Sequence, residues 1–172
     1  MHKPTLARER ALNYDEEGKL EMITNLDKVY NEIEVWARVN NPSFIKFYEL
    51  IDADEHDYMY LILEIADLGQ LAHWDYKIEK YVRNKVIYDT VLEALKESNL
   101  LVTDLPEVEQ VARYLFRQLC EALVHLHEDL KMIHRDIKLD NILFNSSDLQ
   151  VKVTDFTVAK ADLKETTRLF DS

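Results

Sequence analysis

The sequence predicts an α+β fold. Two stretches repeat apolar residues at helical spacing, and two pairs of short apolar runs are separated by turn residues, a pattern typical of antiparallel hairpins. The helices and hairpins follow one another in blocks, which favours the α+β class. With 172 residues, 47% of them apolar and 31% charged, the chain is large enough to bury a hydrophobic core.

The first part of the chain predicts one helix followed by one hairpin. Residues 1–24 are polar and weakly patterned, and we expect no regular element there. A helix is predicted from Leu26 up to the stop signal at 40–42, and two strands at 44–53 and 58–66 flank an acidic turn. The helix rests on the three- and four-residue spacing of Leu26, Val29, Tyr30, Ile33, Trp36 and Ala37.

The second part of the chain predicts further helices and a second hairpin. Residues 74–103 indicate one or two helices, from the spacing of Ile78, Tyr81, Val82, Val91, Leu92 and Leu95. The clearest helix of the chain covers 107–127, and strands at 142–144 and 149–154 are joined by a turn. A boundary near Gly69 divides the chain into residues 1–68 and 69–172.

Charge and cysteine content exclude several classes of function. The net charge of −12 argues against a nucleic-acid or anionic-membrane surface, because both partners need basic patches. Cys120 is the single cysteine, so an internal disulfide is impossible and a cytoplasmic, reducing location is expected. Its place on the apolar side of a predicted helix favours a core position. We find neither an apolar run long enough to cross a bilayer nor a secretory signal.

Glycine content limits any nucleotide site. The chain holds two glycines, Gly18 and Gly69, whereas a glycine-rich phosphate loop needs two or three at fixed spacing. A nucleotide site in this chain would therefore lack its own glycine-rich cradle.

The segment IHRDIKLDNILF, residues 133–144, concentrates the chemistry. Asp136 and Asn141 precede the second predicted hairpin and Asp155 follows it, so a tight hairpin brings them to one corner. Two carboxylates and an amide oxygen are ligands that Mg²⁺ prefers. Lys138 adds a positive charge suited to a transferred phosphate, and Asp136 can orient a hydroxyl nucleophile and accept its proton. The set indicates phosphoryl transfer.

The pattern HRDIKLDN, followed after a hairpin by DFT, resembles the catalytic loop and metal-binding motif of eukaryotic protein kinases. The lysine two positions after the aspartate resembles the serine/threonine branch. The segments VYNEIEVW, NNPSFIKFYELID and DYMYLILEI are most similar to the calcium/calmodulin-dependent protein kinase kinases. The resemblance implies a protein-kinase-like bilobal fold, with residues 1–68 as a partial N-lobe. Residues 69–172 would be the hinge, an inserted helical segment and the start of the C-lobe, through the catalytic loop and early activation segment.

The resemblance also implies roles for individual residues. Asp136 would be the catalytic base, and Lys138 would contact the transferred phosphate. ATP and Mg²⁺ would be the cofactors, with Asn141 and Asp155 as metal ligands. Glu32 would be the helix glutamate that pairs with a strand lysine. Leu63, Glu64, Ala66 and Leu143 would line the adenine pocket, and His134 and Phe156 would pack in an internal spine.

Several family features are missing from the sequence. The glycine-rich loop and the strand lysine are absent, Thr157 stands where the family has glycine, and the helical half that binds substrate is lacking. We therefore expect a truncated central fragment that shows no measurable phosphotransfer alone and binds Mg-ATP weakly.

Three functions remain in competition at this point. The leading one is an ATP-dependent protein serine/threonine kinase, whose protein substrate can itself be a kinase. A regulatory protein is an expected further partner, and we expect no binding to nucleic acid or membrane. The second is a catalytically dead kinase-like binding or scaffold module. The third, a metal-dependent phosphohydrolase, would need a His/Asp cluster at ligand spacing, which we do not find.

Overall fold

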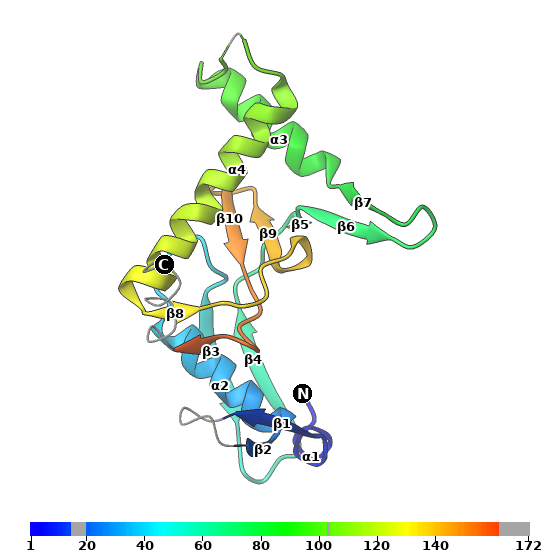
Figure 1. Ribbon diagram of the computed structural model, residues 1–172, viewed down its shortest axis with the longest axis vertical. Coiled ribbons are helices and arrows are strands. Elements are labelled where there is room, and N and C mark those ends of the chain that lie inside the picture. The colour runs from blue at the N-terminus through cyan, green and yellow to red at the C-terminus, as the bar shows by residue number, and fades with distance from the viewer. Residues whose placement is uncertain (15–19, 103, 162–172) are drawn as a thin grey trace, which may run out of the picture.

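The computed structural model describes residues 1–14, 20–102 and 104–161. It combines helices with small antiparallel sheets and confirms the predicted α+β class. The molecule is elongated, with a lower part formed by residues 1–63 and an upper part formed by most of the remainder, while the short strands at 132–133 and 160–161 lie near the middle (Figure 1).

The lower part is built around one helix and one hairpin, as predicted. The helix α2 starts with a capping box, in which the Thr24 hydroxyl accepts from the Asp27 N–H at 3.1 Å and the Asp27 carboxylate accepts from the Thr24 N–H at 2.7 Å. A short helix and a hairpin precede it in the region where no element was expected. The elements in order are α1 (Lys3–Arg8), β1 (Arg10–Tyr14), β2 (Leu20–Thr24), α2 (Asn25–Arg38), β3 (Phe47–Asp52) and β4 (Met59–Leu63).

The upper part contains the long helix α4, packed against α3 and against the sheet β10-β9-β5 (Figure 1). A π-helical turn at His125–Asp129 and a 3₁₀ turn at Leu139–Asn141 flank the short strand β8. The elements are β5 (Gly69–Gln70), β6 (Ala72–Asp75), β7 (Lys80–Arg83), α3 (Lys85–Glu97), α4 (Glu107–Val124), β8 (Met132–Ile133), β9 (Ile142–Asn145), β10 (Gln150–Val153) and β11 (Lys160–Ala161).

The expectation of helix throughout 74–103 is wrong for its first third. Strands β6 and β7 form an antiparallel hairpin that projects from the side of the upper part (Figure 1). Trp74 and Tyr81 face each other across it with ring centroids 5.2 Å apart, and such cross-strand aromatic pairs stabilise hairpins. The expected helix begins only at Lys85, where the Asn84 side chain caps it.

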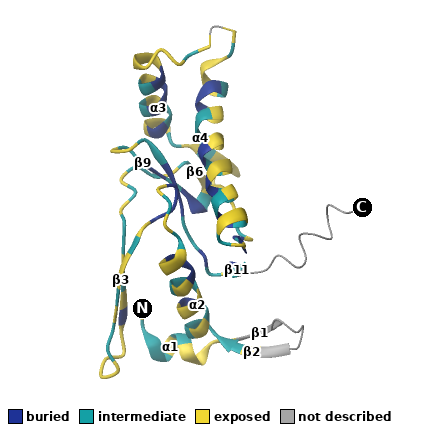
Figure 2. Cartoon of the chain, turned by 90° about the vertical axis from the view of Figure 1, so that its left-hand side faces the viewer, coloured by how far each residue is buried: buried dark blue, intermediate teal, exposed yellow. Residues whose placement is uncertain are grey.

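The two parts share one hydrophobic core. The chain leaving α2 runs beside β10, where the Ile45 N–H donates to the Val153 carbonyl at 2.9 Å and the Val153 N–H donates to the Ser43 carbonyl at 2.8 Å. Buried residues, dark blue in Figure 2, lie on parts of α2, α3, α4 and β9. The largest of them, all less than 2% exposed, are Phe44, Phe144, Phe156, Met59, Leu126, His134, Val91, Val151 and Val153.

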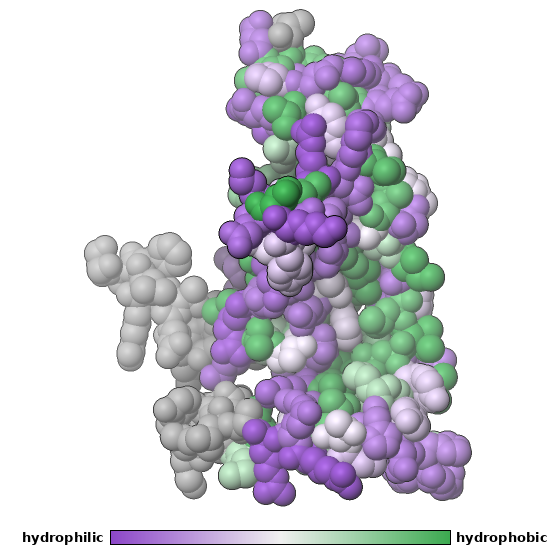
Figure 3. Space-filling model, turned by 90° about the vertical axis from the view of Figure 1, so that its right-hand side faces the viewer, coloured by the Kyte–Doolittle hydropathy of each residue, from purple (hydrophilic) through white to green (hydrophobic). Residues whose placement is uncertain are grey.

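Parts of the apolar surface remain uncovered. Hydrophobic side chains gather along one edge of the face in Figure 3, and the strands β3 and β4 expose Tyr48, Ile51, Tyr60 and Ile62. On α4, Phe116 is 65% exposed. Cys120 is exposed as well, which corrects the expected core position, because only the opposite side of α4 faces the sheet. None of the helices in the described ranges has the length and apolar character that a bilayer crossing needs.

Candidate active site

His134 anchors the loop that follows β8. It is 1% exposed, its Nε2–H donates to the Thr154 carbonyl at 3.1 Å, and its Nδ1 accepts from the Asp136 N–H at 3.3 Å. Burial holds the pKa of His134 below its usual value. The neutral ring packs 5.2 Å from the ring of Phe156, so it ties the loop before β9 to the loop after β10.

Asp136 lies at the centre of a contact with two other predicted site residues. Its Oδ2 is 2.6 Å from Lys138 Nζ and accepts from Asn141 Nδ2 at 2.9 Å. The Lys138 ammonium, followed by the Asn141 amide, keeps the pKa of Asp136 below its usual value, so the carboxylate is ionised at neutral pH. The carboxylate of Asp136 raises the pKa of Lys138, and Asp155 adds to this effect. The charges of Asp136 and Asp155 therefore both act on this lysine.

The loop after β10 contacts the loop before β9 at Asn141. The Thr154 N–H donates to the Asn141 carbonyl at 3.1 Å, which places Asp155 immediately beyond that contact. Asp155 adopts a left-handed backbone with φ of 68°, and its Oδ1 accepts from the Thr157 N–H at 3.3 Å. Left-handed backbone in a residue with a side chain is uncommon and occurs often at functional sites.

The donors in this corner fit a divalent magnesium ion. The buried Asn141 gives its amide N–H groups to Asp136, and within the described residues its side-chain oxygen accepts no hydrogen bond. That oxygen and the Asp155 carboxylate are hard ligands, and Mg²⁺ needs only one or two protein ligands when phosphate oxygens and water complete its shell. By contrast, no group of three or more His, Cys, Asp or Glu is placed to hold a metal in the described residues, so that part gives no support to a phosphohydrolase cluster.

Glu32 reaches the same corner from α2, but its partner is not a lysine. Its Oε1 accepts from the Phe156 N–H and its Oε2 from the Thr157 hydroxyl, both at 3.1 Å. Burial raises the pKa of Glu32, while the Thr157 hydrogen bond acts in the opposite direction. Lys3 on α1 does not take this role, because its Nζ forms an ion pair with Asp52 Oδ1 at 2.8 Å.

The four residues predicted for the adenine pocket lie around the junction of the two parts. Leu63 ends β4 and packs against the core. Ala66 forms a turn, with its carbonyl accepting from the Gly69 N–H at 3.1 Å. Leu143 lies on β9, where buried residues alternate with partly exposed ones, so it faces away from the buried Ile142 and Phe144. The Glu64 side chain, in contrast, is turned to a separate polar network.

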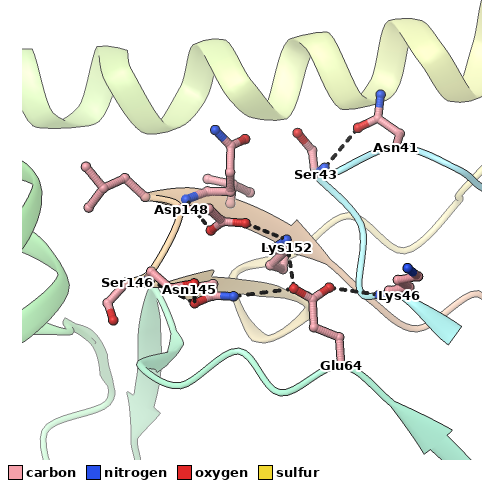
Figure 4. Close-up of polar contacts among 12 residues, drawn as sticks. Asn41, Ser43, Lys46, Glu64, Asn145, Ser146, Asp148 and Lys152 are labelled. Atoms are coloured by element: carbon pink, nitrogen blue, oxygen red, sulfur yellow. Dashed lines mark hydrogen bonds and ion pairs between the residues drawn. The ribbon is translucent and has the colours of Figure 1, made fainter. Parts of the chain in front are cut away.

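The polar network around Glu64 is centred on a buried lysine (Figure 4). Lys152 on β10 is 3% exposed and places its ammonium 2.9 Å from Glu64 and 3.0 Å from Asp148. Glu64 also accepts from the Lys46 N–H at 3.0 Å and from the Asn145 amide at 3.3 Å. Burial lowers the pKa of Lys152, but the two carboxylates outweigh it, and the net shift is upward. A pocket of about 310 Å³ next to Lys152 and Glu64 is separate from the corner at Asp136.

Two residues that sequence reasoning missed hold the loop from the side. Tyr81 on the projecting hairpin donates to Asp140 Oδ2 at 3.2 Å, and the Gln70 amide donates to the Asp140 carbonyl at 3.0 Å. No sequence signal placed either residue beside the loop, because that contact depends on the tertiary fold.

The chain is similar to known protein kinases over most of its length. The family model of the protein kinase domain matches residues 10–170. The fission yeast serine/threonine-protein kinase srk1 is 30% identical over 120 residues, which is 70% of this chain and 16% of that protein. The Drosophila virilis serine/threonine-protein kinase PLK4 is 30% identical over 133 residues, 77% of this chain and 13% of that protein. The human testis-specific serine/threonine-protein kinase 1 is 32% identical over 134 residues, 78% of this chain and 29% of that protein.

The chain therefore spans less than a third of the length of these relatives. The match over most of the chain agrees with the α+β architecture and with the loops at Asp136 and Asp155, and it establishes the partial bilobal kinase fold. The chain belongs to the protein kinase family, and its named relatives are of the serine/threonine type.

Proposed function

We propose that this chain supplies the catalytic loop (residues 134–141) and the metal loop (residues 154–157) of a protein serine/threonine kinase, which transfers the γ-phosphate of ATP to a protein hydroxyl. The observation that carries the proposal is the contact of Asn141 with both loops: its amide binds Asp136, and its carbonyl binds the N–H of Thr154 beside Asp155. This contact fixes the catalytic carboxylate relative to the metal ligands, and phosphoryl transfer depends chiefly on such positioning and on charge neutralisation.

Each residue then has one task. Asp136, held ionised by Lys138, accepts a hydrogen bond from the substrate hydroxyl and takes its proton. Lys138 exchanges this contact for an oxygen of the transferred phosphate. Asn141 and Asp155 hold Mg²⁺, which would neutralise the phosphate oxygens when bound. The adenine ring of ATP would contact the side chains of Leu63 and Leu143 and the backbone of Glu64 and Ala66.

A paramagnetic titration tests the proposal without requiring catalytic turnover. Mn²⁺ takes the same oxygen ligands as Mg²⁺ and broadens nearby NMR signals, so even weak Mn-ATP binding is located. We expect the amide signals of Asp136, Asn141 and Asp155 to broaden first, and Asp155→Asn to remove the effect. Asp54→Asn, in the exposed turn between β3 and β4, is the control that should change nothing. Broadening centred on that turn instead would overturn the proposal.

A kinase-like binding module is the second candidate. The observation in its favour is that Glu32 binds the metal loop, while Lys3 is engaged with Asp52. A lysine that positions the ATP phosphates is therefore not found among the described residues. Phosphotransfer to a generic acceptor separates the two functions. Transfer that disappears in Asp136→Asn supports the kinase, whereas the absence of both transfer and Mn-ATP binding supports the module.

The segments NEIEVW and NNPSFIKFYELID support a narrower proposal, a kinase of the calcium/calmodulin-dependent protein kinase kinase type, with another kinase as substrate and a regulatory protein as partner. Peptides copied from kinase activation segments should then be better acceptors than a generic protein. The single cysteine supports a cytoplasmic location, which fractionation of expressing cells would test.

A further inference from the structure

The helix α2 contacts the metal loop through two hydrogen bonds to the Glu32 carboxylate, and one of them comes from a side chain that glycine at position 157 would lack. Both oxygens of the Glu32 carboxylate are used by one short segment, Oε1 by the Phe156 N–H and Oε2 by the Thr157 hydroxyl, each at 3.1 Å. The partners lie 124 and 125 residues apart in sequence, so the contact joins two distant elements.

Apolar packing next to this pair fixes the same two elements. Trp36 follows Glu32 by four residues and so lies on the same side of α2. Its ring meets the fully buried ring of Phe156 edge-on, with centroids 6.0 Å apart. Phe156 also stacks on Phe44 at 5.6 Å. The loop is therefore held to the helix by one polar and one apolar contact, side by side.

Threonine can occupy position 157 without backbone strain. The non-glycine residues with positive φ include Asp155 but not Thr157, so the backbone there does not require glycine. Glycine would leave Glu32 Oε2 without this donor. A β-branched threonine restricts its own χ1 rotation and thereby keeps the hydroxyl directed at the carboxylate.

We propose that Thr157 is a positioning residue, whose hydroxyl binds the Glu32 carboxylate and thereby fixes the position of the metal loop relative to α2. The Thr157 N–H also binds Asp155 Oδ1 at 3.3 Å, so the same residue restrains a proposed metal ligand. This inference deepens the proposed function, because the loop that Thr157 positions is the one assigned to Mg²⁺. The contact itself requires neither metal nor nucleotide.

Amide hydrogen exchange on the full 172-residue chain tests the inference. The reporter is the Phe156 N–H, which is protected only while Glu32 stays in place. Thr157→Val keeps the shape and removes the hydroxyl, and a hydrogen bond to a charged group predicts about tenfold faster exchange at Phe156. Thr157→Ser restores the hydroxyl and should return the rate to near that of the wild type. Thr90→Val, on α3, is the matched control and should leave the rate unchanged.

A second reporter separates local from global effects. The Val151 N–H is buried and bonded to the Gln118 side chain at 2.7 Å, so its exchange follows general unfolding. The proposal expects the Phe156 rate to rise while the Val151 rate stays constant. Equal rises at both amides, unchanged exchange at Phe156, or failure of Thr157→Ser to restore it would each refute the positioning role. Because no phosphotransfer is measured, this result is independent of whether the chain acts as a kinase.

Discussion

Replacement of Lys152 by methionine tests how the two parts of the molecule are held at their junction. Methionine keeps most of the apolar length of lysine and removes its charge. The lost contact to Glu64, whose side chain is 16% exposed, is a hydrogen bond between charged groups, with a contribution of about 1.5–3 kcal/mol. Asp148 is 39% exposed, so its ion pair adds about 0–1 kcal/mol. We therefore expect Lys152→Met to lower the free energy of unfolding by about 1.5–4 kcal/mol.

Urea denaturation followed by tryptophan fluorescence measures this effect, because Trp36 is buried in the core. Glu64→Gln completes a double-mutant cycle. The loss of unfolding free energy in the double variant, Lys152→Met with Glu64→Gln, should be smaller than the sum of the two single losses by about 1.5 kcal/mol or more. Lys138→Met, at an exposed ion pair, is the control and should change stability little. A negligible effect of Lys152→Met, or strictly additive losses, would refute the charge-coupled junction.

Three further predictions concern the site. Asp136→Asn should abolish phosphotransfer wherever the wild type shows it. The midpoint of urea unfolding should stay nearly unchanged, because this carboxylate is partly exposed. A large loss of stability would show a structural role instead. His134 has a lowered pKa in the fold, so it contributes stability above the ordinary value of 6.5, and that contribution falls as the pH drops below it. Thermal melts should therefore show a larger loss between about pH 7.5 and pH 5.5 for the wild type than for His134→Gln, and parallel pH profiles would contradict this. Phe156→Ala removes a fully buried ring that contacts Trp36, Phe44 and His134. It should lower the free energy of unfolding, measured by urea titration, by about 3–5 kcal/mol. A loss below about 1 kcal/mol would mean that the ring is not packed as described.

The elements with strong periodicity could be predicted from the sequence alone. The apolar spacing of 26–37 gave α2, and that of 107–126 gave α4. The turn at 145–148 fixed the β9–β10 hairpin, and from it followed the approach of Thr154 and Asp155 to the loop that holds Asp136 and Asn141. These features are determined by local sequence and by hairpin closure, both of which a single sequence carries.

Other features depended on contacts between distant segments. The spacing of Ile78, Tyr81 and Val82 predicts helix from residue 74 onward, and only the pairing of Trp74 with Tyr81 shows that 72–83 forms a hairpin instead. Lys152 alternates with valines, a pattern that predicts an exposed lysine. Its actual burial requires Glu64, which lies 88 positions earlier in the sequence.

The partner of Glu32 was beyond sequence reasoning for the same reason. The family pattern directed attention to a missing lysine, whereas the carboxylate binds Thr157, 125 residues away. From the sequence alone, Thr157 is only a departure from the family's glycine. The residue that departs from the pattern is thus the one that makes the unexpected contact.

The central claim is that Asn141 and Asp155 hold one divalent ion beside Asp136. A crystal structure of the chain grown with Mn²⁺ and a non-hydrolysable ATP analogue tests it most directly, because the anomalous signal of manganese locates the ion without reference to any model. The account predicts a single strong peak within about 2.0–2.4 Å of the Asn141 side-chain oxygen and of the Asp155 carboxylate. A peak on other residues, with these two side chains left in contact with solvent only, would contradict it.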